Sequence, residues 1–128
     1  MGLRPMDERA LREQIQQLTV EFRTRDDVFW QRMRELLLAR GIDAATSVLA
    51  QLHTEDTNRW LGIVVTSDRR VFWFLFDHRR SGESSHLAGW EELTGKSTHV
   101  ESRAFANEIE TALNLVARDG PDAKAGPH

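Results

Sequence analysis

The chain has 128 residues, of which 40% are hydrophobic and 29% are charged, a composition typical of one small globular domain. It contains no cysteine, which excludes disulfide bridges, thiolate metal ligands and a cysteine nucleophile. The formal net charge of −3 argues against a nucleic-acid-binding protein. No apolar run approaches the roughly 18–20 residues of a membrane span, and the first residues lack the apolar core of a signal peptide. We therefore expect a cytoplasmic protein that binds neither nucleic acid nor membrane.

Apolar residues at spacings of four, three and four predict a helix over residues 7–23. They are Leu11, Ile15, Leu18 and Phe22. The apolar pattern resumes at Phe29 after the polar residues 24–27, so either two helices or one sharply kinked helix is possible. One helix over 7–40 would be about 51 Å long, against about 36 Å for a compact chain of this size. We therefore favour two helices, with Gly41 ending the second in the left-handed conformation.

After Gly41 the apolar pattern changes to the period of two that is typical of strands. Residues 45–54 predict a strand, with a short helix as the alternative because Leu49 interrupts the alternation. The strongest β signal is a hairpin, in which the strand 59–66 reverses at residues 67–69 into the strand 70–77. A fourth, shorter strand is expected over residues 87–93, at the edge of the sheet.

The last predicted element is a helix at about residues 103–117, with Ser102 as its N-cap and Gly120-Pro121 as its stop. Its expected buried side chains are Phe105, Ile109, Ala112, Leu113 and Val116. The chain is thus predicted to form one α+β domain over residues 1–120, followed by a disordered tail over 121–128. The predicted fold is an antiparallel meander of three to four strands packed with two N-terminal helices and one C-terminal helix, with the helices on one face of the sheet.

The predicted strand 70–77 is apolar on both faces. Val71, Trp73 and Leu75 point to one side, whereas three phenylalanines, at positions 72, 74 and 76, point to the other. Two interpretations follow. The N-terminal helices could cover one face while the C-terminal helix or the loop 78–86 covers the other, or part of the strand could contact a partner protein or a second copy.

Histidines are the obvious candidates for acid–base or metal chemistry, and His53, His78 and His86 could in geometry form a zinc site across neighbouring strands. None of the histidines falls in a motif of known mechanism, and the serines of the loop 81–85 do not form a nucleophile elbow. The adjacent carboxylates Glu91 and Glu92 diverge on a strand and so cannot flank one bond. The basic pair Arg69-Arg70 is interpreted as a solvated hairpin end rather than an anion site. We expect no enzymatic activity, no metal and no cofactor.

The sequence from Gly62 to Phe74, continuing to Gly89-Trp90-Glu-Glu-Leu-Thr and the final helix, resembles small bacterial immunity-type proteins of polymorphic toxin systems. The resemblance covers roughly residues 45–118 and lies in the pattern of a strand pair, a loop, a tryptophan strand and a closing helix. It implies a non-catalytic protein that binds a toxin domain and blocks its active site. The turn 66–70 is also similar to one in bacterial pleckstrin-like domains, although too few residues follow Trp90 to complete such a barrel.

The predicted partner-binding residues are Trp90, Glu91 and Glu92 on the edge strand, together with Glu83 and His86 of the preceding loop. An aromatic anchor beside acidic residues suits a basic protein partner, because the acids speed the encounter and the aromatic group supplies affinity. Residues 81–128 contain eight acidic against four basic residues, which fits this interpretation. The alternative function is a regulatory or adaptor module that acts through a homodimer or another protein interface.

Overall fold

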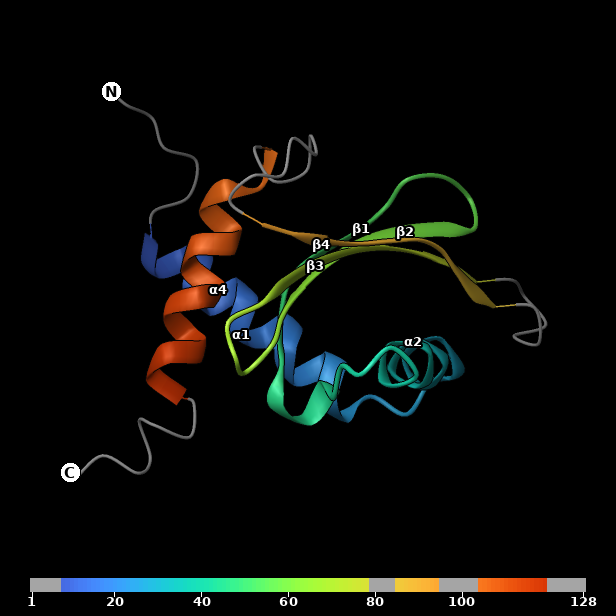
Figure 1. Ribbon diagram of the computed structural model, residues 1–128, viewed down its shortest axis with the longest axis horizontal. Coiled ribbons are helices and arrows are strands. Elements are labelled where there is room, and N and C mark those ends of the chain that lie inside the picture. The colour runs from blue at the N-terminus through green and yellow to red at the C-terminus, as the bar shows by residue number, and fades with distance from the viewer. Residues whose placement is uncertain (1–7, 79–84, 95–103, 120–128) are drawn as a thin grey trace.

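The computed structural model describes residues 8–78, 85–94 and 104–119 (Figure 1). Within these ranges the elements are α1 (Glu8–Thr24), α2 (Val28–Leu38), the short 3-10 helix η1 (Ala44–Thr46), β1 (Val48–Thr54), β2 (Arg59–Val65), β3 (Val71–Asp77), β4 (His86–Leu93) and α4 (Ala106–Asp119). The strands form an antiparallel sheet in the order β1-β2-β3-β4. The predicted α+β meander with two N-terminal helices and one C-terminal helix is therefore confirmed. The proposed N-cap Ser102 and the tail 121–128 lie outside the described residues.

The N-terminal region forms two helices, as favoured from the sequence. Residues 25–27 separate them, and Arg25 there forms an exposed ion pair with Asp27 at 2.8 Å. The guanidinium of Arg34 on α2 donates a hydrogen bond of 2.9 Å to the carbonyl oxygen of Phe22, in the last turn of α1. A cation at that position satisfies a carbonyl that has no partner within its own helix. Arg34 therefore links α2 to the last turn of α1.

Gly41 follows α2 with a φ of 87°, as the sequence predicted. The amide of Gly41 donates to Leu38 O and the amide of Ile42 donates to Leu37 O, at 2.9 and 3.0 Å. This is the Schellman pattern, in which a residue of positive φ reverses the chain and the next residue packs back on the helix. The side chains of Leu37 and Ile42 are both buried, which anchors the turn to the core.

The region 45–54 forms the short helix η1 and then the strand β1, so both structures considered for it occur. The register between β1 and β2 shifts between Leu49 and Gln51, which leaves Ala50 as an extra residue in a β-bulge. Leu49 packs in one core cluster and Ala50 in the other. Consecutive residues at the start of β1 are apolar because both faces of the sheet are buried there, and the bulge returns Leu52 to the cluster that contains Leu49.

Both faces of the sheet are covered by helices, which corrects the expectation that the helices lie on one face. Val71, Trp73 and Leu75 pack with α4 and with Ile15 of α1, on the side we call the α4 face. The three phenylalanines of β3, at positions 72, 74 and 76, pack with α2 and with Phe22 of α1, on the α2 face. Figure 1 shows α2 and α4 apart, with the strands between them and α1 passing from one to the other. The internal covering of the second face, one of our two interpretations, is therefore observed.

Helix α1 reaches both core clusters because it runs beside β1, the outer strand of the sheet. The backbone amide of Leu49 donates to the hydroxyl of Thr19 at 3.0 Å, and Arg23 donates to Ser47 O at 2.8 Å. These bonds satisfy backbone groups at the start of β1 that have no hydrogen-bond partner in a neighbouring strand. Among the helices that the structure describes, none has the length and apolar character needed to cross a membrane.

The hairpin between β2 and β3 closes through Thr66, which exchanges backbone hydrogen bonds with Arg69 and Arg70 at 2.9 Å each. Arg69 has a φ of 67°, the left-handed conformation that ends a short hairpin loop of this kind. Its side chain donates a hydrogen bond of 2.9 Å to the carbonyl oxygen of Leu113 on α4. Arg69 therefore links the turn to α4 rather than only marking a solvated hairpin end.

Candidate functional site

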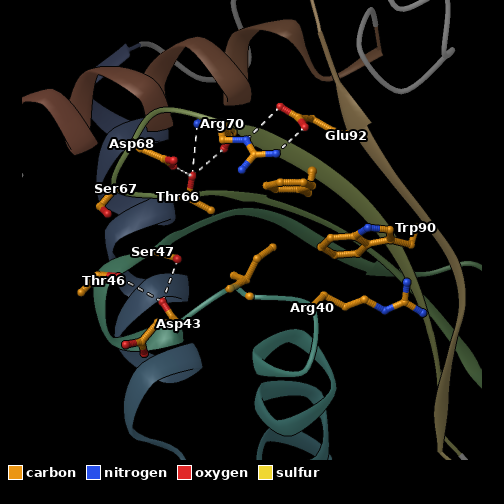
Figure 2. Close-up of a pocket in the computed structure, with 13 residues that line it drawn as sticks. Arg40, Asp43, Thr46, Ser47, Thr66, Ser67, Asp68, Arg70, Trp90 and Glu92 are labelled. Atoms are coloured by element: carbon orange, nitrogen blue, oxygen red, sulfur yellow. Dashed lines mark hydrogen bonds and ion pairs between the residues drawn. The ribbon is translucent and has the colours of Figure 1, made fainter.

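A pocket of about 490 Å³ opens where four segments meet on the α2 face (Figure 2). These segments are the end of α2, the loop through η1, the turn between β2 and β3, and strand β4. The labelled side chains that line it are Arg40, Asp43, Thr46, Ser47, Thr66, Ser67, Asp68, Arg70, Trp90 and Glu92. The Schellman turn at Gly41 and the hairpin turn at Arg69 contribute residues to two of these walls, and the packing of the elements brings the two turns to one pocket.

An aromatic pair forms the inner wall of the pocket. The rings of Trp90 and Phe72 stack with centroids 4.8 Å apart and planes inclined by 15°. The guanidinium of Arg40 lies 5.5 Å from the centre of the Trp90 ring, and that of Arg70 lies 5.2 Å from the centre of Phe72. Each cation is attracted by the negative face of its ring. Two aromatic rings and two guanidinium groups therefore form one packed series across the pocket.

Arg70 is held in this series by Glu92. Its Nη2 and Nε donate to the two carboxylate oxygens of Glu92 at 2.8 and 3.1 Å, a bidentate arrangement. The hydrogen bonds from Arg70 lower the pKa of the Glu92 carboxyl below its ordinary value, and Glu92 raises the pKa of Arg70 in turn. Glu92 is thus an anion that already has a cationic partner within its own chain.

The outer rim of the pocket is acidic. Asp43 accepts a hydrogen bond of 2.9 Å from the amide of Ala45, and Asp68 accepts one from the hydroxyl of Thr66. These bonds fix both carboxylates, while neither forms an ion pair with an Arg or Lys side chain in the described part of the chain. The pocket therefore presents an aromatic wall, two guanidinium groups, and two carboxylates that form no ion pair with an Arg or Lys side chain of the described residues.

The structure separates the residues predicted as one partner-binding patch. Trp90 and Glu92 lie opposite Phe74 and Phe72 in the register of β3 and β4, so they share the α2 face and line the pocket. Glu91 and His86 lie opposite Trp73 and Asp77, which places them on the α4 face. Glu83 lies outside the described residues. Alternation along a strand separates the neighbours Glu91 and Glu92, which the linear sequence joins.

The structure does not bring the three candidate zinc ligands together. His53 is on β1, between Gln51 and Glu55, with each of its ring nitrogens 2.9 Å from one of these side chains. His86 is on β4, at the opposite edge of the sheet from β1. In residues 8–78, 85–94 and 104–119, no three His, Asp or Glu side chains are grouped so that they could hold a metal ion.

His78 contacts a serine hydroxyl, with Nδ1 3.0 Å from Ser85 Oγ. Its ring lies at 5.2 Å from Phe29 and 5.5 Å from Phe76, between centroids, and so is part of the apolar packing around α2. Neither His78 nor Ser85 lines the pocket of Figure 2. The contact therefore joins the end of β3 to the residue that precedes β4.

Reasoning from the sequence missed Arg40, Asp43 and Asp68. Each is within two residues of a signal that was recognised, namely the Gly41 cap or the turn at residues 67–69. Those signals predict where the chain turns, but not that the two turns face each other.

Comparison with known proteins identifies no relative of this chain, because no family model, curated protein or solved structure matches it.

Proposed function

We propose that this protein is a non-catalytic protein-binding protein that captures its partner at the pocket beside Trp90. The observation that carries this proposal is the half-buried Trp90 on an outer strand, stacked on Phe72 at a pocket with an acidic rim. Aromatic residues in such positions are common anchors of protein interfaces, because their large apolar surface becomes buried when the partner binds. Asp43 and Asp68 would attract a basic partner and speed its encounter.

The partner class that we propose is a bacterial toxin domain, with the present chain as the immunity protein that neutralises it. The resemblance in the hairpin, the tryptophan strand and the closing helix suggests this class, and the net charge of −3 suits a basic toxin. The proposal is tested by co-expressing the chain with the toxin domain encoded beside its gene. Growth should be restored by the intact chain. A toxin that remains fully active beside folded protein would contradict the proposal.

The role of the acidic rim is tested with a charge-removing pair of substitutions, Asp43→Asn and Asp68→Asn. An amide oxygen can still accept the hydrogen bonds from Ala45 and Thr66, so the turns should fold as before. The double variant should associate more slowly with the toxin, and the difference should shrink as salt is added. The comparison is made by stopped-flow mixing at low and high ionic strength.

Asp56→Asn is the matched control for this experiment. Asp56 likewise accepts backbone hydrogen bonds in a turn, from the amides of Asn58 and Arg59, but it does not line the pocket. Its substitution removes one negative charge and should change the association rate little. Asp43→Asn and Asp68→Asn as single variants each remove one charge as well, and equal slowing by Asp56→Asn and by these single variants would show that net charge matters and that the pocket does not.

A regulatory or adaptor module that acts as a homodimer is the second candidate function. The observation that favours it is the position of β4 at the end of the strand order, with strand pairing on one side only within the described residues. A module of this kind would show no toxin neutralisation, and its surface would pair with a second copy or with a strand of another protein.

A further inference from the structure

A second pocket, of about 450 Å³, lies where α1, α2 and the start of η1 meet, and we call it the α1–α2 pocket. Arg23 comes from α1, Arg34 and Leu38 come from α2, and Asp43 is the N-cap of η1. Of the described residues that line it, Asp43 alone also lines the pocket beside Trp90. Its volume lies within the range of about 300–1,000 Å³ that is usual for small-molecule sites.

Two guanidinium groups line the α1–α2 pocket without an acidic partner. Arg23 donates to Ser47 O through Nε and Nη2 at 3.2 and 2.8 Å, and Arg34 donates to Phe22 O through Nη1 at 2.9 Å. A carbonyl oxygen carries no net charge, so these bonds hold each group in place and leave its positive charge uncompensated. Neither arginine forms an ion pair with an Asp or Glu side chain in the described ranges. Because a guanidinium has five N–H donors, both groups keep donors for an oxyanion.

Two carboxylates also line the α1–α2 pocket, and they differ in their partners. Glu35 forms an ion pair of 2.9 Å with Arg32, so a cation of its own helix already compensates its charge. Asp43 accepts a hydrogen bond from the amide of Ala45 but forms no ion pair with any described cationic side chain. The pocket therefore holds two cations and one anion that lack an oppositely charged neighbour.

Asp43 and Arg23 are brought together by one turn of the chain. Ser47 accepts from Arg23 through its carbonyl oxygen, and its hydroxyl donates to the backbone oxygen of Asp43 at 2.8 Å. Figure 2 shows the Asp43 carboxylate turned away from Trp90. The positive and negative groups of the α1–α2 pocket are thus fixed at neighbouring points of one rigid segment.

Leu38, the last residue of α2, adds an apolar wall. Its side chain is 61% exposed, the highest value among the large apolar side chains of the described residues. Ala44 and Ala45 line the same pocket. An exposed leucine is ordinary on a protein surface, but this one shares a pocket with three charges that lack ion-pair partners. A ligand with an aliphatic group would bury Leu38 while its charged groups bind the others.

We propose that the α1–α2 pocket binds a free α-amino acid with an aliphatic side chain, such as leucine. Arg23 and Arg34 would bind its carboxylate, because guanidinium groups suit the planar geometry of that group. Asp43 would bind its ammonium, and Leu38 would contact its side chain. A simple carboxylic acid would be repelled by Asp43, and a simple amine would be repelled by the two arginines. A zwitterion is the small ligand that satisfies both signs of charge at once.

Calorimetric titration of the purified full chain with leucine tests the proposal, and it needs no toxin. Two analogues of similar shape separate the charges, since 4-methylpentanoate lacks the ammonium and isopentylamine lacks the carboxylate. Leucine should bind at one site per chain, and each analogue should bind about tenfold more weakly or worse, because each leaves a charged group without its partner. No binding of leucine at millimolar concentration, or equally tight binding of either analogue, would overturn the proposal.

Asp43→Asn provides a readout that a purely structural role would not produce. It removes the partner of the ammonium and the charge that repels a lone carboxylate, so leucine should bind more weakly and 4-methylpentanoate more tightly. A change in the same direction for both ligands, in a variant whose circular dichroism is unchanged, would contradict the proposal. Because leucine binding is measured without a toxin, a failure to neutralise any toxin would leave this result unaffected.

Arg34→Gln tests the opposite end of the ligand. Glutamine keeps an N–H donor but lacks the charge, so leucine affinity should fall about tenfold while the affinity for isopentylamine rises. Arg9→Gln is the matched control. Arg9 lies on α1 in an exposed ion pair with Glu13 and does not line the α1–α2 pocket. An equal loss of leucine affinity in Arg9→Gln and Arg34→Gln would place the site elsewhere and overturn the proposal.

Discussion

The hydroxyl of Thr19 on α1 accepts a hydrogen bond of 3.0 Å from the backbone amide of Leu49 on β1, and both residues are buried. A side chain of one element thus satisfies a backbone donor at the bulged end of another. Replacing Thr19 by Val keeps the shape and removes the acceptor, which leaves a buried amide without a partner. We expect a loss of about 1–3 kcal/mol in the free energy of unfolding. Chemical denaturation measures it, and hydrogen exchange at Leu49 should accelerate.

The control for this prediction is Thr24→Val in the last turn of the same helix. The hydroxyl of Thr24 donates to Val20 O at 2.7 Å but is exposed, so water can replace the bond. This change should alter the unfolding free energy by no more than about 0.5 kcal/mol. Similar losses for Thr19→Val and Thr24→Val would mean that helix propensity, rather than the bond to Leu49, explains the effect.

Phe74 and Trp73 are neighbours on β3 with different burial. Phe74 is 0% exposed on the α2 face, whereas Trp73 is only partly buried on the α4 face. Truncation of Phe74 to Ala should therefore cost about 3–5 kcal/mol, from lost apolar contact and from the cavity left behind. Trp73→Ala should cost less despite the larger side chain. Urea denaturation of both variants decides the order, and the reverse order would contradict the burial described here.

Position 62 requires glycine because of the side chain that lies opposite it on β3. It lies opposite Phe74, whose ring occupies the space that a Cβ atom at position 62 would need. Gly62→Ala should cost about 1–3 kcal/mol, the usual range for overpacking a core. Adding Phe74→Leu to Gly62→Ala should cost less than Phe74→Leu alone, because the smaller side chain makes room. Strict additivity in this double-mutant cycle would contradict the contact.

Substitutions of Arg40 and Trp90 distinguish the contribution of the pocket to stability from its contribution to partner binding. Trp90→Ala removes a half-buried ring from the α2-face cluster and should lower the unfolding free energy by about 2 kcal/mol. The exposed Arg40 contributes a cation–π contact worth about 0.5–1 kcal/mol at such a site. Arg40→Ala should thus lower the thermal midpoint only slightly. The proposed function predicts that it nevertheless changes affinity for the partner, which calorimetric titration would measure.

The pair of Arg70 and Glu92 predicts a pH dependence. Because the pKa of Glu92 is lower in the folded chain than in the unfolded one, the pair stabilises the fold above the ordinary glutamate pKa. This stabilisation is lost as the pH falls through the lowered pKa. In Arg70→Gln, a carboxyl NMR titration should show the pKa of Glu92 moving up toward its ordinary value.

The corresponding pair of Arg25 and Asp27 is the control for the titration. Hydrogen bonding to Arg25 lowers the pKa of Asp27 in the same way, at a site between α1 and α2 that is not part of the pocket. Arg25→Gln should raise the pKa of Asp27 and leave that of Glu92 unchanged. A response of Glu92 to Arg25→Gln would mean that net charge, and not the bidentate pair, sets its pKa.

The predicted interface residues Glu91 and Glu92 lie on opposite faces of the sheet. Reversing Glu91 and Glu92 together would combine two effects, since Glu92 holds Arg70 on the α2 face while Glu91 lies on the α4 face. Lysine at position 92 would also face Arg70 with a like charge, and a lower thermal midpoint would follow from that repulsion. Asp43→Asn and Asp68→Asn remove charge at the pocket without breaking an ion pair between described residues.

Local chemistry determined the elements of this protein. The spacing of apolar residues predicts α1 and α4, the β-branched and aromatic run predicts the hairpin, and Gly41 predicts the end of α2. Each of these signals lies within a few residues of the feature that it specifies, so the sequence alone is sufficient. The alternation on β3 likewise predicted that both faces of the sheet would be covered or bound, although not which helix would cover which face.

Tertiary packing decided the rest, because it joins residues that the sequence separates. Asp43 and Asp68 line one pocket only because two independent turns face each other, and no local signal records that distance. Adjacent Glu91 and Glu92 are separated because a strand alternates its side chains and Arg70 binds only one of them. The sequence by itself thus determined which elements form, whereas the packing of helices against both faces of the sheet determined where the candidate site lies.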